Sequence, residues 1–538
     1  MDRYNRDDSA VGEDGAEYEE YAEGYERDTI VGFLTQMPYW TVSAVIHLVL
    51  IVVAVSIVTS EPAPEEEAIP ITVRNPPPPT PYDPRRKRDV KKTPKILKEK
   101  SDQKVITKRI DTVTPDIQKG SELNRTNAMT ATSINTAMGA GGGAAGAYGH
   151  RLGKGTLVAE GGSEGTEEAV RAALEWLVRH QDEDGSWKAV DFMRSSSGDS
   201  ANKNAKRYPS DRGWEEHDNG VTALAILAFT GYGHTHRYGV YPEYVATLKK
   251  AVKYLKSTQL RSHEPTENGR YGGDGAKHWI YNHAIATMAM AELLVMSNDV
   301  IGLRQSVTDA VKLILHAQNP GFGWRYQPQG GDNDTSVTGW MVLALKTAKL
   351  ANLDIPETAY NRSFADALQF FRRVTNTNGK AGYESPGDQG SGLQDEYDGE
   401  YPFSKDLSCM TAVSVLCRIF AGERRTEPDI RKGIGILTRQ PPLWQEQRGR
   451  LKSTINIYYW YYGSYALFQY GGKPWEEWNE AMQKSLLGTQ RVGGDEDGSW
   501  DPIGEWGIAG GRVYATAIGA MTLEVYYRFR RAQEGQGF

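Results

Sequence analysis

The stretch "QDEDGSW" (Gln181–Trp187) decides the fold, because it returns twice further along the chain. It reads "QRVGGDEDGSW" at Gln490–Trp500 and, more loosely, "QNPGFGW" at Gln318–Trp324. A Gln side chain can hydrogen-bond unpaired carbonyls at a helix end, and a glycine turns the chain sharply. The Trp then packs against the next helix. We call this unit the Gln–Gly–Trp clasp, and we interpret it as a structural joint rather than as a functional site.

The clasps connect two alternating kinds of predicted helix. Six amphipathic segments cover residues 167–181, 243–259, 303–318, 363–376, 427–440 and 475–490, and five of them end in Gln. Six nearly apolar segments, rich in Ala, Thr, Ser and Gly, cover residues 219–233, 281–295, 335–349, 407–422, 458–472 and 513–529. A helix that is apolar on every side must be buried. The pattern therefore predicts an all-α domain over residues 164–535, a single (α/α)6 toroid of six outer and six inner helices.

The repeated clasp on alternating helices resembles the prenyltransferase and squalene-oxidase repeat. That repeat builds the α/α toroids of terpenoid cyclases and of protein prenyltransferase β subunits. The resemblance covers residues 164–530 and implies a central cavity that holds isoprenoid substrates. Fold does not decide chemistry, so activity depends on whether this chain carries the catalytic residues of either family.

Squalene-type cyclases carry an Asp-x-Asp-Asp-Thr acid motif at the start of an inner helix, and the middle Asp protonates an alkene. The matching stretch here is "GDNDTSVTGW" (Gly331–Trp340), which places Asn333 at the proton-donor position. Asp332 is an out-of-register substitute. Asp334 is a candidate acid, with an N-cap role in the third inner helix as the alternative. Cyclases of this class also usually have two toroids, whereas this chain is predicted to have a single toroid.

Protein prenyltransferases bind catalytic zinc through Asp, Cys and His at inner-helix starts. Asp406 and Cys409 lie at a comparable place, but their spacing is Asp-x-x-Cys and the later His is missing. His278 and His283 are the nearest replacements. We therefore predict no metal and no cofactor, with zinc as the alternative. The two cysteines, Cys409 and Cys417, exclude a disulfide framework and a Cys-x-x-Cys zinc site.

Aromatic residues gather near the inner-helix starts, where the mouth of the ring should lie. Such a lining suits an apolar chain, a carbocation or a sugar face. Acidic residues near the same mouth (Glu215, Glu216, Asp218) leave open a polysaccharide-cleaving (α/α)6 enzyme with paired carboxylates. We predict that the ligand cavity is formed by Trp279, Tyr281, His283, Trp340, Asp406, Cys409, Tyr458, Trp460 and Tyr514.

The N-terminal part of the chain has a different character. Residues 1–38 hold eleven acidic and three basic side chains, which predicts a disordered acidic tail. Residues 39–60 contain no Lys, Arg, Asp or Glu, and about 20 apolar residues span a bilayer as a helix. Residues 61–163 combine Pro-rich, basic and Gly-rich stretches, which predicts a disordered linker. The basic residues of the linker gather at positions 85–109, where no aromatic residue occurs. We therefore expect this stretch to contact anionic lipid rather than nucleic acid.

The predicted span carries Ser43 and His47, four residues apart and therefore on one helix face. A span with Ser-x-x-x-His, followed by "EPAPEEEAIPITVRNPPPPTP", resembles the N-terminus of the TonB energy transducer. In that family this face engages a proton-driven motor of the ExbB/ExbD type. The resemblance covers about 45 residues, and the TonB C-terminal domain is absent. It implies a single-pass protein of the bacterial inner membrane with its toroid on the periplasmic side.

From the sequence we expect a membrane-anchored toroid that binds an apolar, isoprenoid-like ligand or an envelope partner in its cavity, without standard cyclase or prenyltransferase catalysis. One alternative is a terpenoid cyclase-like or prenyltransferase-like enzyme acting on isoprenoid lipids. Another is a cell-envelope scaffold or glycan-active toroid coupled to a TonB-type motor. The identity of the ligand and the oligomeric state stay open.

Overall fold

The structure is a computed structural model. It describes residues 47, 151, 157–158, 160–190, 213–272, 278–389, 404, 407–446, 448 and 452–528. Within these ranges the chain forms thirteen α-helices, a 3-10 turn and isolated bridges such as Gln259 with Tyr271 and Thr375 with Ala381, and no β-strand. The prediction of an all-α fold is confirmed for this part of the chain.

Twelve of the helices alternate between amphipathic and buried. The amphipathic set, which we call the outer helices, is α6 (Glu164–Arg179), α9 (Pro242–Ser257), α11 (Val300–Ala317), α13 (Glu357–Val374), α15 (Pro428–Leu437) and α17 (Gly472–Leu487). The buried set, the inner helices, is α8 (Asp218–Gly231), α10 (Trp279–Ser297), α12 (Thr335–Lys349), α14 (Cys409–Phe420), α16 (Ile457–Tyr470) and α18 (Gly507–Leu523). The 3-10 turn η3 (Glu215–His217) precedes α8, and the short α19 (Val525–Arg528) ends the series.

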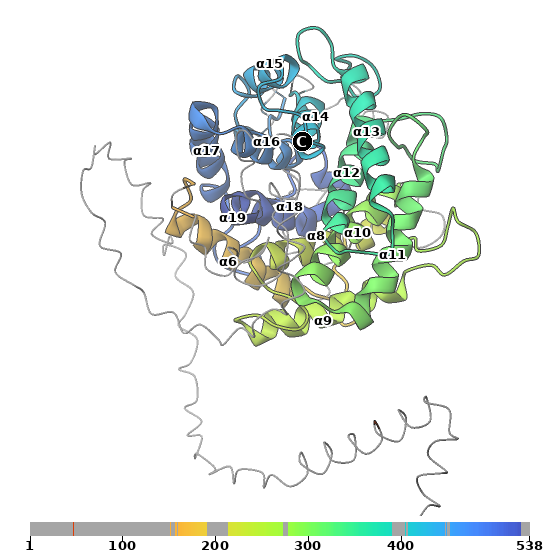
Figure 1. The fold of residues 1–538 in the computed structure, drawn as a ribbon. Coiled ribbons are helices and arrows are strands. Elements are labelled where there is room, and N and C mark those ends of the chain that lie inside the picture. The colour runs from red at the N-terminus through yellow and green to blue at the C-terminus, as the bar shows by residue number, and fades with distance from the viewer. Residues whose placement is uncertain are drawn as a thin grey trace, which may run out of the picture. The chain divides into compact units, whose positions relative to one another are not determined.

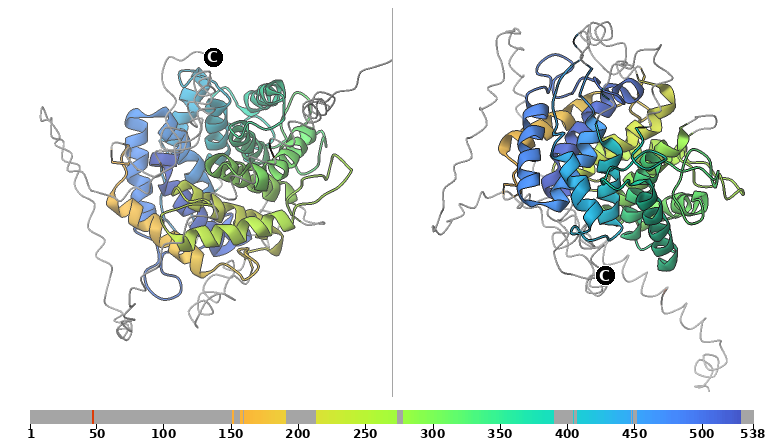
Figure 2. Two further views of the ribbon diagram at one scale, coloured as in Figure 1. Left: turned by 60° about the horizontal axis from the view of Figure 1, so that its bottom comes forward. Right: turned by 90° about the horizontal axis from the view of Figure 1, so that it is seen from above.

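The inner helices contact one another in cyclic order. Each packs on the next in the series, and α18 packs back on α8. The outer helices lie around them, and α17 contacts α6 (Figures 1 and 2). Four of the outer helices, α6, α11, α13 and α15, pack on two neighbouring inner helices, so their apolar stripes are covered on both sides.

Small side chains permit this crowding of inner helices. An added Cβ at Gly339 in α12 would lie 2.4 Å from Val413 of α14. At Gly463 in α16 it would lie 2.4 Å from the ring of Trp478 in α17. Larger residues at these positions would push the helices apart, because a packed core has no free space for a methyl group.

The Gln of the clasp joins one outer helix to the next. The Nε2 of Gln181 donates to Gly185 O in its own turn (3.0 Å) and to Thr247 O in α9 (2.9 Å). The same pair of bonds recurs from Gln259 to α11 and from Gln318 to α13. Gln490 bonds to Gly498 O and to Ala169 O of α6, both at 2.8 Å, which links the last outer helix to the first.

The Trp of the clasp satisfies a helix-end carbonyl. We expected Gln to do this, and that assignment is wrong, because the Gln amide reaches a neighbouring helix. Trp187 Nε1 donates to Leu177 O at the end of α6 (2.8 Å), and its backbone N–H donates to Thr222 Oγ1 of α8 (2.9 Å). Trp324 and Trp500 make the equivalent pairs of bonds. The unit therefore ties an outer helix, its successor and an inner helix together.

Glycine in the clasp is required on two grounds. Gly185 has φ of +92°, and an added Cβ would lie 2.4 Å from Lys250 O in α9. Gly498 has φ of +93°, and its Cβ would lie 2.1 Å from Ala172 O in α6. Positive φ strains any residue with a side chain, and here the neighbouring backbone also leaves no room.

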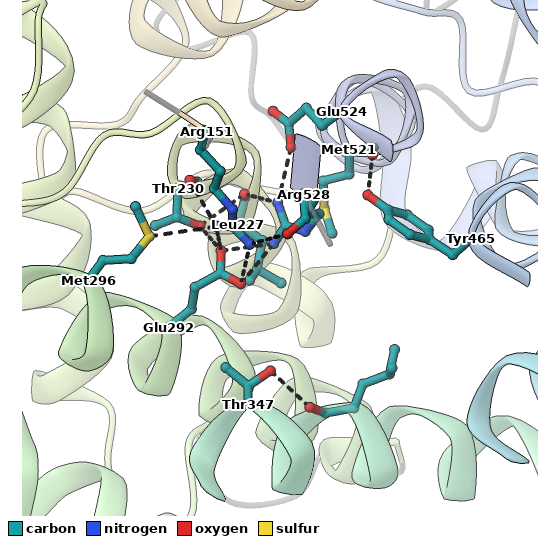
Figure 3. Close-up of polar contacts among 11 residues, drawn as sticks. Arg151, Leu227, Thr230, Glu292, Met296, Thr347, Tyr465, Met521, Glu524 and Arg528 are labelled. Atoms are coloured by element: carbon teal, nitrogen blue, oxygen red, sulfur yellow. Dashed lines mark hydrogen bonds and ion pairs between the residues drawn. The ribbon is translucent and has the colours of Figure 1, made fainter. Parts of the chain in front are cut away.

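A buried charge network joins the two ends of the helical domain (Figure 3). Arg151, Glu292 of α10 and Arg528 of α19 all have fully buried side chains. Glu292 accepts from Arg151 Nη1 at 2.7 Å and from Arg528 Nη2 at 3.0 Å. Arg151 and Leu157 fall in the segment that the sequence assigned to the linker, yet both are buried. A residue from just before α6 and a residue of α19 are thus joined through α10.

The chain divides into two compact units, Met1–Asp83 and Pro84–Phe538. In the first, the structure describes only His47, which is helical and exposed. The rest of the predicted tail (1–38) and membrane span (39–60), and most of the linker (61–163), lie outside the described residues. None of the described helices is both long and apolar enough to cross a bilayer.

Candidate functional site

A cavity of about 110 Å³ lies at the N-terminal ends of the inner helices. Five of the six inner helices, or the turns just before them, contribute to its wall. Most of the lining is aromatic or aliphatic. The lining residues are Trp214, His217, Gly220, Val221, Leu224, His278, Tyr281, Asn282, Ile285, Tyr326, Ser336, Trp340, Tyr458, Trp506, Ala509, Gly510 and Tyr514.

Four residues of the predicted ligand set line this cavity: Tyr281, Trp340, Tyr458 and Tyr514. The rings of Trp340 and Tyr458 lie 6.3 Å apart, and Tyr458 OH is 3.0 Å from Ser336 Oγ. Tyr281 and Ile285 line it together because residues four apart share one face of a helix. The structure brings these side chains together from four different inner helices.

Three other members of the predicted ligand set, Trp279, Trp460 and His283, do not line the cavity. Trp279 packs against His283 (ring centroids 5.9 Å apart) and under the guanidinium of Arg270. Trp460 packs against Trp444, with ring centroids 5.9 Å apart. Trp279 and Trp460 are each two residues from a lining tyrosine, Tyr281 and Tyr458. Two residues correspond to about 200° around a helix. Those side chains therefore face the outer layer, and their assignment to the cavity is wrong.

His283 has a structural role in the clasp that follows α9. This second clasp runs from Gln259 to Tyr271. Its Nδ1 accepts from Tyr271 N at 3.2 Å, and its Nε2 is 3.2 Å from Ala310 O. Tyr271 stands where other clasps have Trp, and His283 stands where α8 and α12 have Thr222 and Thr338. Burial lowers the pKa of His283 to about 3, so the ring is neutral at physiological pH. The prediction that His283 lines the cavity is wrong for this reason.

The two acidic candidates do not line the cavity. Asp334 is the N-cap of α12, and its Oδ1 accepts from Val337 N at 2.7 Å. Its side chain is fully buried, which raises its pKa to about 7 despite Arg325 at 3.9 Å. Asp332 is 56% exposed and pairs with Arg325 (3.3 Å). Asn333 holds the preceding turn by accepting from Gly323 N, so the stretch that resembles the acid motif forms part of a clasp.

The cysteine-based zinc ligands are not assembled in the described residues. Asp406 lies outside them. Cys409 opens α14 and is half-buried, and Cys417 is buried in the core. Burial raises the pKa of the Cys409 thiol well above its usual range, which disfavours the thiolate that binds metals.

Sequence reasoning missed several lining residues because they lie in turns rather than in helices. Trp214, Tyr326 and Trp506 belong to the segments that lead into α8, α12 and α18. An aromatic residue in the turn just before an apolar helix is a sequence feature that could have predicted these lining residues. Trp506 packs against Tyr458 with ring centroids 6.2 Å apart, so the turns complete the aromatic wall.

A polar cluster interrupts the apolar wall beside η3. His278 Nδ1 lies 3.0 Å and His217 Nε2 lies 3.6 Å from Oε1 of Glu216. The ring of Trp214 stacks on His217 at 5.7 Å, and Tyr326 meets His278 edge-on at 5.2 Å. Burial lowers the pKa of His217, with Glu216 opposing this and His278 adding to it. We call these three residues the Glu–His–His cluster.

The predicted motor face is described only in part. His47 is exposed and helical, while Ser43 lies outside the described residues. The structure therefore gives no geometry for this pair.

Comparison with known proteins gives little. No protein-family model matches the chain, and no curated protein matches it. Among solved structures, one similar chain is titled "a novel alpha-amylase from Clostridium perfringens". It shares 11% identity, and the alignment covers 67% of this chain and 97% of that one with a TM-score of 0.42. At this level of similarity, neither the fold nor the activity of that protein transfers to this chain.

Proposed function

We propose that this chain is a membrane-tethered, single α/α toroid that binds one end of an apolar, isoprenoid-like ligand. The observation that carries the proposal is the aromatic cavity at the inner-helix N-terminal ends. Cyclic packing of inner helices inside outer helices supports the toroid. The clasp bond from Gln490 to Ala169 supports its closure.

The size of the cavity favours binding over cyclisation. Its volume of about 110 Å³ is close to that of an engineered apolar cavity of about 150 Å³ that holds a benzene molecule. A space of this size takes a chain end of a few carbons rather than a folded triterpene. Trp340, Tyr458 and Trp506 offer ring faces and edges to such a chain.

The test is ligand binding by the full-length chain in detergent, with farnesol as probe and dodecanol as an unbranched comparison. Ile285→Trp should fill the cavity and weaken farnesol binding at least tenfold, with circular dichroism unchanged. Val492→Trp is the matched control, because Val492 is an exposed residue outside the cavity wall. Equal binding by wild type and Ile285→Trp would remove the cavity from the proposal. If wild type binds neither farnesol nor dodecanol, the proposal of an isoprenoid-like ligand is overturned.

One observation favours the enzymatic alternative. A pKa of about 7 leaves part of Asp334 protonated at neutral pH, as a general acid requires. Its neighbour Tyr383 bonds to Tyr326 of the cavity wall (OH to OH, 2.8 Å). Turnover of squalene or farnesyl diphosphate by wild type, lost in Asp334→Asn with the fold intact, would establish this activity. Without turnover by wild type, Asp334 is a capping residue only.

The anchor and its coupling are also part of the proposal. Residues 39–60 are proposed to span the inner membrane, with the Ser43/His47 face in contact with an ExbB/ExbD-type motor. The support is the Ser-x-x-x-His spacing in an uncharged segment. His47→Ala should abolish any function of the protein that depends on the proton-driven motor, while the protein stays in the membrane fraction. If function is unchanged in His47→Ala, the segment is a passive anchor.

A further inference from the structure

Two inner helices begin with histidines that do not cap them. The N-cap of α8 is His217 and that of α10 is His278, and neither side chain makes a capping hydrogen bond. Asp334 and Asn456, at the same position of α12 and α16, both cap their helices. His217 and His278 instead turn towards Glu216 of η3. Helix capping therefore does not explain these two histidines.

The three side chains converge at metal-ligand distances. One atom each from Glu216, His217 and His278 lies within 4.8 Å of the other two, and two of the pairs measure 3.0 and 3.6 Å. Tetrahedral zinc with bonds of about 2.0–2.2 Å separates neighbouring ligand atoms by about 3.3–3.6 Å. Small side-chain rotations would bring all three atoms to one ion. Among the described residues no other group of His, Cys, Asp and Glu side chains comes this close.

The surroundings of the cluster suit a bound cation. The ion pairs recorded for Glu216 within the described residues are both with histidine, so no Lys or Arg there competes for its carboxylate. Asn282 donates from Nδ2 to Glu216 O at 2.6 Å and fixes η3 against α10. The aromatic rings of Trp214 and Tyr326 pack on the two imidazoles and hold their orientation. Such outer contacts position ligands in metal sites.

We propose that Glu216, His217 and His278 bind a Zn²⁺ ion at the wall of the cavity. Two histidines and one glutamate form a ligand set that leaves a fourth position open, as in catalytic zinc sites. His217 and His278 both line the cavity, so the open position faces the same space as the aromatic rings. The site would take a ligand that carries an oxygen donor, such as a hydroxyl or phosphate, next to an apolar chain. This ligand set differs from the Asp406–Cys409 set suggested by the sequence.

The test is zinc content and affinity of the full-length chain, purified through a tag without histidine. Wild type should retain about one zinc per chain after dialysis, measured by elemental analysis. Titration with Co²⁺ should give the intense visible bands of a tetrahedral site. His217→Asn and His278→Asn should each lower zinc affinity beyond the 10–100-fold that loss of an outer contact costs.

Two further variants keep the result interpretable. Glu216→Gln keeps the size of the side chain and removes only its charge, so it should fold normally and lose the Co²⁺ spectrum. His263→Ala is the matched control, because His263 is an exposed histidine outside the cluster. Zinc binding that is equally weak in wild type and all variants would overturn the proposal. Stoichiometric zinc that survives both His217→Asn and Glu216→Gln would also do so. Neither result depends on whether the cavity binds farnesol.

Discussion

At the scale of single residues, one side chain can serve a helix and yet be costly to ionise. Asp334 caps α12 through Val337 N, and its second carboxylate oxygen is buried 3.9 Å from Nε of Arg325. The cap stabilises the helix by about 0.5–2 kcal/mol, while burial disfavours the charged form that caps best. The balance of these effects depends on pH, because only the ionised form carries the desolvation cost.

We expect Asp334 to make stability fall as pH rises from about 4 to about 7. In this window the unfolded chain loses the proton of Asp334 while the native state keeps it, since the native pKa is about 7 and the ordinary value is 3.8. The unfolding free energy should drop by at most about 1.4 kcal/mol per pH unit from this group. Asp334→Asn keeps a capping oxygen and cannot ionise.

The measurement is urea unfolding of wild type, Asp334→Asn and Asp334→Ala at pH 5 and pH 8. Asp334→Asn should gain stability relative to wild type between the two pH values. Asp334→Ala should be less stable than Asp334→Asn at both, because it lacks the cap. A constant difference between wild type and Asp334→Asn would show that Asp334 has an ordinary pKa in the native state.

At the scale of elements, the clasp explains why so few residues specify the joint between helices. Gln reaches the next outer helix, Trp reaches its own outer helix and an inner helix, and glycine lets the backbones approach. These roles hold in the three clasps with Trp. In the clasp that follows α9, Tyr271 and His283 replace Trp and Thr, and the Tyr271 hydroxyl bonds to Ser306 of the next outer helix, α11, rather than to a carbonyl of α9. The fifth outer helix departs from this pattern, because Gln440 Oε1 accepts from Ser408 N at the start of α14.

Gln490→Ala should destabilise the domain by about 1–3 kcal/mol. The change removes two hydrogen bonds, to Ala169 O and Gly498 O, each worth about 0.5–1.5 kcal/mol. Gln305→Ala is the control, since Gln305 is exposed and bonds to Asp309 within its own helix α11. Urea unfolding midpoints of the two variants should differ clearly. Equal midpoints would mean that the bond between the last and first outer helices contributes nothing to stability.

At the scale of the whole helical domain, buried charges connect a residue that precedes the first outer helix with the last helix. Glu292 lies between Arg151 and Arg528 (Figure 3). Burial alone would raise its pKa, but the two guanidinium groups outweigh this and lower it. Glu524 shows the opposite balance: burial raises its pKa to about 8 in spite of Arg528 at 3.0 Å. Glu292 is therefore the carboxylate that balances the two arginines.

Glu292→Gln should cost about 3–5 kcal/mol of stability, because it leaves two buried guanidinium groups without their carboxylate. Glu175→Gln is the matched control. Glu175 pairs with Arg171 at 2.9 Å on the surface, and such a pair contributes at most about 1 kcal/mol. Thermal unfolding followed by circular dichroism measures both. A loss in Glu292→Gln no larger than in Glu175→Gln would show that the buried network contributes no more to stability than a surface ion pair.

The sequence by itself determined the helical periods, the alternation of amphipathic and apolar segments, and the clasp residues. These are local signals, because a helix face repeats every 3.6 residues and a glycine turn is set by its own φ. The same signals predicted the aromatic residues at the mouth in part. Tyr281 and Tyr458 line the cavity, while Trp279 and Trp460 point to the outer layer, since rotation about each inner helix was not known.

Only the tertiary structure decided which distant side chains meet. Arg151 and Arg528 are 377 residues apart, and Glu216 and His278 are 62 residues apart, yet both pairs are in contact. Such contacts depend on the order in which the helices pack on one another and on the rotation of each helix, which packing of the whole core fixes. The Glu–His–His cluster and the buried charge network therefore appear only when the helices are assembled.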